Sequence, residues 1–285
     1  MNKIWKYIFI TLLLILALTC LLILESPDSN LHIIACDVGQ GDSILITYKN
    51  IQVLTDGGPN NNVLTCLSSH MPFWDREIEL VILTHPQKDH YFGLIEVAKR
   101  YKLDNFLYNP LDVSSQEYKA LESAMGGKGV NLINPRVGMT IRLGLMQLEI
   151  VHPHSKDLVV GVNPSDVDPN LFSIVYLLNY GQFKGIFTGD MDPGTSESLA
   201  SNWTKGSVNY IKVPHHGSKN GMTENLLKRL VPRVGVISVG RNNTYGHPHK
   251  EIMEMLKKYN VKTYRTDNDG EVEIVTNGKD FWKKN

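Results

Sequence analysis

Apolar residues are spaced in two ways along this chain, after one long uninterrupted apolar run near its N-terminus. Short apolar blocks closed by glycine, proline or polar residues predict buried strands, and segments with apolar residues at every third or fourth position predict helices. Strands are predicted at residues 31–36, 43–47, 51–54, 79–83, 146–151, 172–178, 183–187, 210–213, 234–239 and 261–265. Helices are predicted at residues 63–70, 94–101, 196–202, 224–230 and 251–259.

The order of these elements favours a layered fold. The first strands follow one another closely, and the later strands alternate with helices. Early hairpins followed by strand–helix units are typical of sheets covered by helices, so we expect an α/β (α+β layered) protein. The simplest division is an N-terminal segment over residues 1–29 and one domain over residues 30–285.

The N-terminal segment carries a membrane signal. No charged residue occurs from Ile8 to Leu24, Lys3 and Lys6 precede this run, and Glu25 and Asp28 follow it. A run of this length is at the short end of the range that spans a bilayer, and the flanking charges place the N-terminus inside. We therefore expect a single-pass protein of the cell membrane whose domain lies outside the cytoplasm.

Two alternatives stay open for this segment. A cleaved signal peptide would make the domain a secreted protein, although no small-x-small cleavage site follows the run. A lipid-modified Cys20 is the other interpretation, but the apolar run continues beyond Cys20. An uncleaved anchor is favoured.

Composition narrows the function classes only slightly. Lys and Arg together number 29, as do Asp and Glu. The formal net charge of zero gives no global attraction to nucleic acid or acidic lipid, although a local basic groove can occur on a neutral protein. Cys36 and Cys66 do not make a disulfide framework. Because Cys36 lies in an apolar strand, we expect a buried free thiol and no bond between the two.

Residues that can bind metals follow the ends of several predicted strands. His85, Asp89 and His90 come directly after the strand at 79–83, and Asp190 follows a later apolar strand. Imidazole nitrogen and carboxylate oxygen together suit zinc, manganese or iron. The sequence therefore predicts a metal site at one edge of the sheets.

Six short segments contain most of these polar residues. They are DVGQGDS (Asp37–Ser43), TDGG (Thr55–Gly58), LTHPQKDHYFGL (Leu83–Leu94), FTGD (Phe187–Asp190), VPHHGS (Val213–Ser218) and YGHP (Tyr245–Pro248). Taken together and in this order, they resemble the metallo-β-lactamase superfamily and, more narrowly, the soluble hydrolase-like domain of the ComEC competence-protein family. The similarity covers about residues 31–278.

This resemblance implies an αββα sandwich, here preceded by one transmembrane helix, with a site for two divalent ions (zinc or manganese) at one edge. His85, Asp89 and His90 occupy the superfamily's H-x-H-x-D-H positions, and Asp190 would bridge the ions. Asp89 is also expected to act in catalysis.

Supporting and further binding roles also follow from the resemblance. Asp56 resembles the early structural Asp beneath the metals, Asp42 would lie beside it, and Asp37 and Gln40 share the Asp37–Ser43 segment.

Three histidines compete for the last ligand position, since His215, His216 and His247 all follow strands that should end at the same edge. We expect His215 to be a ligand and His216 to act catalytically, near the substrate phosphate or leaving group. His247 would be a ligand or would support one.

The chain departs from the superfamily pattern in two places. Gln87 stands where a histidine or aspartate is usual, and its neutral amide is a poorer ligand. No clear histidine precedes Asp190 in the expected place, although His152 and His154 compete for it, and Asn170 and Ser173 match an N-x-x-S pattern of ComEC-like chains. One full metal site and one weak site are therefore expected.

A carboxylate-bridged pair of divalent ions can activate water and stabilise both oxygens of a phosphodiester displacement. The predicted function is therefore metal-dependent phosphodiester hydrolysis outside the cell, on single-stranded DNA or an envelope phosphodiester. With one apolar span the chain is not itself a DNA channel, so a role in DNA uptake would need competence-type partners. The alternative is a degenerate module, marked by Gln87, that binds nucleic acid or an envelope ligand with little turnover.

Overall fold

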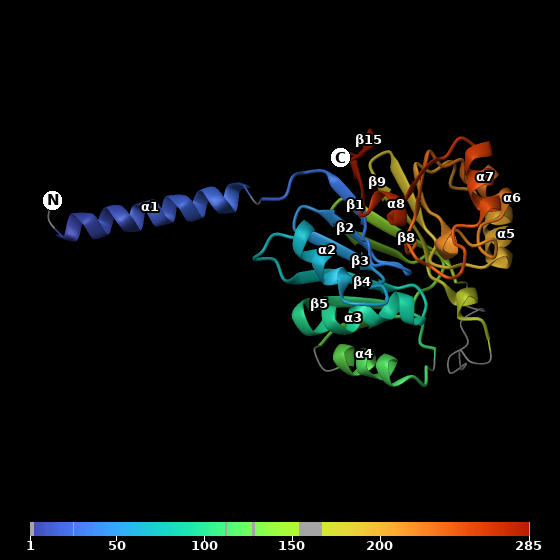
Figure 1. The fold of residues 1–285 in the computed structure, drawn as a ribbon, viewed down its shortest axis with the longest axis horizontal. Coiled ribbons are helices and arrows are strands. Elements are labelled where there is room, and N and C mark those ends of the chain that lie inside the picture. The colour runs from blue at the N-terminus through green and yellow to red at the C-terminus, as the bar shows by residue number, and fades with distance from the viewer. Residues whose placement is uncertain (1–2, 25, 112, 127–128, 154–166, 285) are drawn as a thin grey trace.

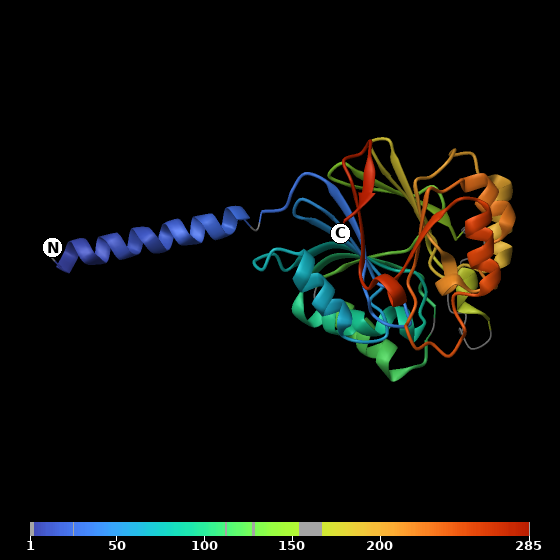
Figure 2. The same cartoon turned by 45° about the horizontal axis from the view of Figure 1, so that its top comes forward.

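The structure, a computed structural model, describes residues 3–24, 26–111, 113–126, 129–153 and 167–284. Helix α1 (Lys3–Leu24) projects from two β-sheets that face one another and carry helices on their outer faces (Figure 1; Figure 2). This arrangement confirms the expected αββα sandwich. Helix α1 is long and apolar enough to cross a membrane.

Within the described residues, the first sheet has eight strands in the order β15-β14-β1-β2-β3-β4-β5-β6. Strands β1 to β3 form antiparallel hairpins, whereas β3 to β6 run parallel. The bounds are β1 (Leu31–Ala35), β2 (Ile44–Tyr48), β3 (Ile51–Thr55), β4 (Glu77–Leu83), β5 (Lys102–Tyr108), β6 (Asn131–Ile133), β14 (Val272–Thr276) and β15 (Phe281–Lys283).

The second sheet has seven strands in the described part of the chain, in the order β13-β12-β11-β10-β9-β8-β7. Strands β7 to β10 are antiparallel neighbours, whereas β10 to β13 run parallel. The bounds are β7 (Thr140–Leu143), β8 (Met146–His152), β9 (Val175–Tyr180), β10 (Phe183–Phe187), β11 (Tyr210–Lys212), β12 (Val234–Ile237) and β13 (Lys262–Arg265).

Amphipathic helices bury the outer face of each sheet (Figure 1). The first sheet is covered by α2 (Asn62–His70), α3 (Lys88–Arg100) and α4 (Gln116–Gly126), and the second by α5 (Pro193–Asn202), α6 (Glu224–Leu230) and α7 (Lys250–Lys258). The short helical turns are η1 (Pro169–Phe172), η2 (Pro214–Gly217) and α8 (Thr266–Asp269).

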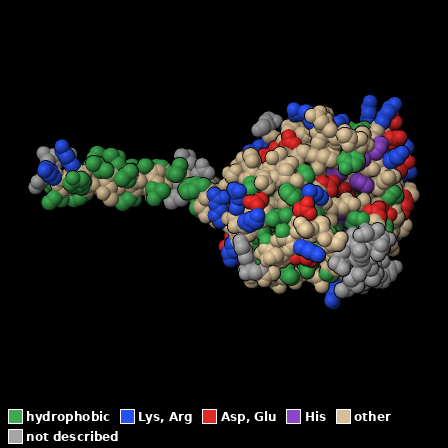
Figure 3. Space-filling view, turned by 60° about the horizontal axis from the view of Figure 1, so that its bottom comes forward, with side chains coloured by type: hydrophobic (Ala, Val, Ile, Leu, Met, Phe, Trp, Pro, Cys, Tyr) green, Lys and Arg blue, Asp and Glu red, His purple; other side chains and the backbone are tan. Residues whose placement is uncertain are grey.

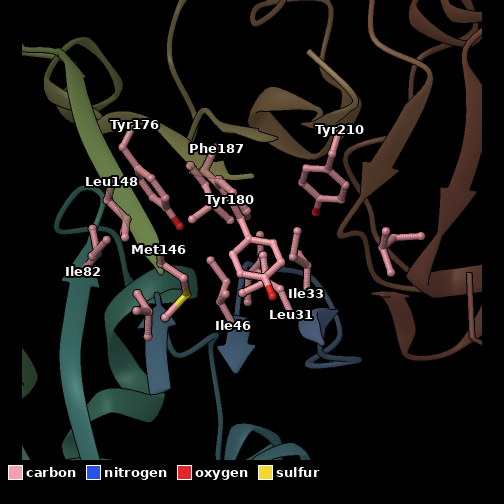
Figure 4. Close-up of a cluster of buried hydrophobic side chains, with 14 of the residues drawn as sticks. Leu31, Ile33, Ile46, Ile82, Met146, Leu148, Tyr176, Tyr180, Phe187 and Tyr210 are labelled. Carbon is pink, nitrogen blue, oxygen red and sulfur yellow. The ribbon is translucent and has the colours of Figure 1, made fainter. Parts of the chain in front are cut away.

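Strand β1 is buried on both faces. Leu31 and Ile33 point into the core between the sheets (Figure 4), whereas Ile34 and the following Cys36 pack with the helices of the first outer layer. A strand covered on both sides needs apolar residues at consecutive positions, which is why this segment reads as a continuous apolar run.

The strands that carry the candidate ligands end together. Strands β1, β3 and β4 share one direction, as do β10, β11 and β12, and the contact of His90 with Asp190 shows that both sets end at the same edge. We call this the carboxyl edge, and the opposite edge, where these strands begin, the amino edge. The segments that follow the strands at the carboxyl edge are 36–43, 56–61, 84–87, 188–192, 213–223 and 238–249.

Three parts of the predicted secondary structure differ from the structure. Strands β14 and β15 lie in residues 272–283, where the sequence predicted no element. Strands β5, β6 and β7 and helix α4 lie in residues 102–143, where the sequence predicted no element. Their polar and exposed positions interrupt both the strand and the helix spacing. Helix α3 begins at Lys88 rather than at residue 94.

The expectation of a free Cys36 is wrong. Cys36 and Cys66 form a disulfide, with their Cα atoms 5.8 Å apart. Cys36 follows β1 with its side chain on the outer face of the sheet, where α2 carries Cys66. Their proximity depends on packing between β1 and α2, which the spacing of two cysteines does not reveal.

Candidate metal centre

The loop after β4 places the first candidate ligand, His85, which is fully buried. Its Nδ1 lies 3.1 Å from the hydroxyl of Thr84 and 3.4 Å from that of Ser173, and its Nε2 lies 3.1 Å from Oε1 of Gln87. Burial, with a further contribution from His90, lowers the pKa of His85 to about 3, so the ring is neutral at neutral pH. Neutral imidazole is the form that binds a metal.

The first turn of α3 holds two more candidates, because Gln87 takes the N-cap position. Asp89 and His90 therefore lie in a helix that begins before the predicted start at residue 94, and the helix dipole favours a carboxylate there. Nδ1 of His90 lies 2.8 Å from Oδ2 of Asp56. Asp56 also accepts hydrogen bonds of 2.8 Å from the amide and hydroxyl of Thr84, so it holds the loop and the helix against each other.

Glycines allow the loops to approach α3 closely. The amide of Gly57 donates to the carbonyl of His90 over 2.6 Å, and a Cβ at Gly93 would lie 2.0 Å from the carbonyl oxygen of Gly57. A Cβ at Gly41 would lie 2.3 Å from the carbonyl oxygen of Asp89. A side chain at Gly41 would push the 36–43 segment away from α3 and its candidate ligands, and a side chain at Gly93 would push away the 56–61 segment.

The second sheet contributes Asp190 and His216 from segments that follow β10 and β11. Nε2 of His216 lies 3.2 Å from Oδ2 of Asp190 and 3.4 Å from Oδ2 of Asp89. Its Nδ1 lies 2.9 Å from the carbonyl oxygen of Ser238. His215 and His216 both have left-handed backbone, with φ of 51° and 53°, a conformation that costs about 1–3 kcal/mol at a non-glycine residue. This turn directs His216 into the cluster and leaves His215 at its rim.

A buried cation in the centre was not predicted from the sequence. Lys212 is 1% exposed; its Nζ contacts Oδ2 of Asp42, lies 3.2 Å from Oδ1 of Asp190 and donates to the carbonyl of Gly189 over 2.9 Å. Burial alone lowers the pKa of an ammonium, but Asp42 and Asp190 raise the pKa of Lys212 above its ordinary value, so it is charged. Its signal in the sequence is a lysine that ends an apolar strand directly before Val213–Ser218.

Carboxylates dominate the electrostatics of the centre. Burial by itself favours the neutral rings, yet Asp190 and its neighbouring carboxylates raise the pKa values of His90 and His216 well above the ordinary value. Burial would also raise the pKa of Asp190, but His216, Lys212 and His90 hold it well below the usual range. The protons on His90 and His216 thus offset the negative charge of the neighbouring carboxylates. A bound metal cation can offset the same charge instead.

The donors fit a divalent cation. Among the described residues, Asp89, His90 and His216 bring one ligand atom each within 4.8 Å of one another, and so do His85, His90 and Asp190. Nε2 of His90 and Nε2 of His216 are buried and face carboxylate oxygens at 3.2–3.4 Å, but neither makes a well-oriented hydrogen bond within the described part of the chain. Both groups share His90, whose Nδ1 already faces a carboxylate, so its other nitrogen can serve only one ion.

The 36–43 segment brings two of its three predicted supporting residues to the centre. Oδ1 of Asp42 lies 3.4 Å from Nδ1 of His216. Oε1 of Gln40 accepts a 3.0 Å hydrogen bond from the amide of Gly240, which ties this segment to the one after β12. Asp37 is instead exposed and accepts a local hydrogen bond from the amide two residues along the chain.

A cleft of about 640 Å³ opens beside these residues. Tyr245 at its rim is 66% exposed and stacks on His247, with ring centres 5.7 Å apart and planes at 23°. His247 in turn stacks near His216 at 6.3 Å and 29°. Burial, followed by His216 and His215, lowers the pKa of His247 to about 4, so its ring is neutral at neutral pH. Three nearly parallel rings thus lead from the surface to the cluster.

The position before Asp190 gains no histidine from the described residues. His152 is buried, with Nε2 2.9 Å from the carbonyl oxygen of Leu171, and belongs to neither ligand group. His154 lies outside the described residues. Asn170 lines the cleft, and the hydroxyl of Ser173 accepts a 3.2 Å hydrogen bond from the amide of Asp190.

No protein-family model matches the chain. ComE operon protein 3 of Bacillus subtilis is 24% identical over 258 residues, covering 83% of this chain and 32% of that protein. Recombination protein 2 of Haemophilus influenzae is 26% identical over 266 residues, covering 92% of this chain and 31% of that protein. The chain thus spans about a third of the length of these relatives, and its expected similarity to competence proteins is confirmed.

Among solved structures, the metallo-β-lactamase fold protein YhfI from Bacillus subtilis aligns with a TM-score of 0.56 at 10% identity, over 89% of this chain and 100% of that chain. At this identity the similarity concerns the fold alone. The chain has the metallo-β-lactamase fold, and its carboxyl edge carries His and Asp clusters suited to a metal-dependent hydrolase.

Proposed function

We propose that this chain is a metal-dependent phosphodiesterase that acts on nucleic acid outside the cytoplasm. The observation that carries the proposal is the cluster of Asp89, His90, His216 and Asp190, assembled from both sheets at one edge. Divalent ions in such sites supply activated water and positive charge for phosphodiester hydrolysis. Zinc and manganese both suit the mixed nitrogen and oxygen donors.

The two ions would have unequal ligand sets. Asp89, His90 and His216 would hold one ion as a complete set of charged and imidazole donors. On the other side, His85 and the neutral amide of Gln87 would hold the second ion, with Asp190 shared between the two. This side lacks the charge of the first, so its ion would bind more weakly.

The geometry favours an exchange of the roles expected for the vicinal histidines. His216 lies among the ligands, whereas His215 lines the cleft, and its Nδ1 makes no hydrogen bond within the described residues. We assign the metal to His216 and contact with a phosphate oxygen or the leaving group to His215. His247 would support the rim by stacking, since it lies outside both ligand groups.

Nearby residues would hold the ligands in place. Asp56 accepts from Nδ1 of His90 and so directs Nε2 toward the cluster, as carboxylates commonly do for metal-binding histidines. Lys212 engages Oδ1 of Asp190, which leaves Oδ2 facing His90 and His216.

Nucleic acid is favoured over an envelope phosphodiester on two grounds. The relatives include proteins named for recombination and competence, which are processes of DNA. The exposed ring of Tyr245 lies at the mouth of the cleft, and bases of single-stranded nucleic acid stack on such rings. In a DNA-uptake role, the chain would act with competence-type partners.

The disulfide supports a location outside the cytoplasm. Buried disulfides persist in oxidising compartments and are rare in the reducing cytoplasm. The bond between Cys36 and Cys66 therefore fits a domain exported behind α1, with α1 kept as the anchor.

Metal content and turnover test the proposal together. The full chain, purified in detergent without chelator, should contain zinc or manganese by mass spectrometry. It should also cleave bis-p-nitrophenyl phosphate and single-stranded DNA. Asp190→Ala should lower turnover by at least about a thousandfold, because metal sites supply several kcal/mol of transition-state stabilisation. Asp37→Ala is the matched control, since that carboxylate is exposed and outside the cluster.

Equal activity of Asp190→Ala and the unmodified chain would exclude the proposed centre. A chain that binds neither ion and cleaves neither substrate would instead favour the degenerate binding module, with Gln87 as the first residue to restore.

A further inference from the structure

The amino edge is on the side of the domain where α1 connects. Residues 25–30 separate the end of α1 from the start of β1. A connection of this length spans at most about 25 Å, so a membrane-spanning α1 would hold the amino edge close to the bilayer. The inference below rests on the proposed membrane anchoring of α1.

The direction of the strands places the metal centre on the far side. Strands β1, β3 and β4 all begin at the amino edge and deliver the ligand-bearing segments at the other. A five-residue strand such as β1 rises about 17 Å. Figure 3 shows histidine side chains in the half of the domain away from α1, and Lys and Arg side chains gathered beside the junction with α1.

Large apolar side chains protrude from two turns at the amino edge. Phe73 and Trp74, in the loop that leads into β4, are 54% and 39% exposed, and their rings meet edge to face with centres 4.8 Å apart. Leu145, in the turn between β7 and β8, is 66% exposed.

Both turns flank the start of β3. The carboxylate of Asp75, beside Trp74, accepts a 3.2 Å hydrogen bond from the side chain of Gln52, and Gly144, beside Leu145, packs against Ile51. The apolar side chains therefore lie on the same edge of the sandwich, at the tips of short and well-held turns.

We propose that Phe73, Trp74 and Leu145 dock the amino edge on the phospholipid bilayer that α1 crosses. Trp74 has an apolar ring with a polar N–H, which favours the interface between headgroups and acyl chains, whereas Phe73 and Leu145 are wholly apolar and gain by leaving water. Lys49, at the tip of the β2–β3 turn, and Arg100, at the end of α3, lie at the same edge and can reach headgroup phosphates. The cleft then faces the aqueous phase rather than the headgroups, which suits a soluble polymer as substrate.

Environment-sensitive labels in the reconstituted full chain test this orientation. In a Cys20→Ser background, Phe73→Cys and Tyr245→Cys each supply one reactive thiol, because Cys36 and Cys66 stay bonded. Both positions are exposed in the domain, so they form a matched pair on opposite edges. Each is labelled with the fluorophore NBD in phosphatidylcholine vesicles that contain nitroxide-labelled lipid. The native Cys20, labelled in the unmodified chain, reports the anchor.

Docking predicts blue-shifted NBD emission and nitroxide quenching at position 73, and water-like unquenched emission at position 245. Adding Trp74→Ser and Leu145→Ser should abolish the quenching at position 73 while circular dichroism stays unchanged. Quenching at Cys20 with none at position 73 would overturn the docking and keep the anchor. No quenching at either would overturn both. Quenching at position 73 without quenching at Cys20 would support docking and exclude α1 as the span.

Discussion

The two proposed ligand sets of the candidate metal centre differ in how completely their donors are supported. On one side, Asp89, His90 and His216 form a compact group, and both histidines have their second nitrogen fixed by a neighbouring oxygen. On the other side, His85 faces the neutral amide of Gln87, and Asp190 gives one oxygen to Lys212.

The two proposed ligand sets differ more in charge than in the number of donors. Lys212 is a permanent cation beside the shared carboxylate, so it already supplies part of the positive charge that a second ion would bring. We therefore expect the first set to bind its ion tightly and the second set to bind weakly. Four measurements test this difference.

The largest effect is expected at the vicinal histidines. His216→Ala removes a proposed ligand of the first set and should weaken its ion by more than the tenfold to hundredfold, about 1.4–2.7 kcal/mol, typical of losing a residue that only orients a ligand. His215→Ala should leave metal affinity unchanged and lower turnover. Titration with a competing chelator measures both variants, and equal loss of affinity in the two would refute the exchanged roles.

The next effect concerns the buried ammonium. Lys212→Met leaves Asp42 and Asp190 without their cation and should destabilise the metal-free protein by about 3–5 kcal/mol in urea unfolding. Added divalent metal should recover more stability in this variant than in the unmodified chain. Lys184→Met is the control, because its Nζ also bonds to a backbone carbonyl but lies outside the centre. Equal unfolding free energies for the two variants would show that Lys212 does not stabilise the fold by offsetting the charge of Asp42 and Asp190.

The third effect is a dependence on pH. With rising pH, the stability of the metal-free protein should fall and the affinity for metal should rise. His90 and His216 have folded-state pKa values raised above the unfolded value, mainly by Asp190 against the effect of burial. Their contribution to stability is therefore full below about pH 6.5 and is lost as the pH rises through the raised pKa values.

Chelator-treated protein should accordingly become less stable as the pH rises above about 6.5, whereas metal affinity should rise because the ligands must lose their protons. Thermal unfolding with and without metal measures both trends. A stability of the metal-free protein that rises over this range would contradict the assigned protonation.

The smallest effect is expected at the second ligand set. Gln87→Asp adds a charged oxygen beside His85 and should tighten the second ion by about tenfold, or 1.4 kcal/mol. Gln87→His should tighten it as well, and Gln87→Asn, which keeps the neutral amide, is the matched control. Metal stoichiometry at low free metal gives the readout. If Gln87→Asp and Gln87→Asn bind the same number of ions, the weakness of this set has another origin.

The sequence predicted the layers and the edge of the centre because strand ends and ligand types are local features. His85, Asp89, His90 and Asp190 all lie where the strand endings place them. The position of Lys212 could not be predicted, because lysine is ordinarily exposed and only the packing of β11 between two neighbours buries it.

The sequence also could not predict which of His215 and His216 directs its ring into the centre. In a regular strand, successive side chains alternate between faces, but both residues adopt left-handed backbone in a tight turn. Which ring enters the centre then depends on this turn and on the carbonyl of Ser238 that receives Nδ1 of His216. Asp37 was predicted as a supporting residue because it lies in a matching motif, yet it is exposed to solvent.

The bond between Cys36 and Cys66 has a consequence for anyone who prepares this protein. Cys36 is the first residue of the 36–43 segment that carries Gln40 and Asp42, so the bond and the wall of the cleft are parts of one continuous piece of chain. Dithiothreitol in a buffer would cut that bond and, through its own thiolates, compete for zinc. The protein should therefore be produced in an oxidising host compartment and stored without thiol reductants. Only then can inactivity of a preparation be attributed to the protein itself rather than to loss of the disulfide or of zinc during preparation.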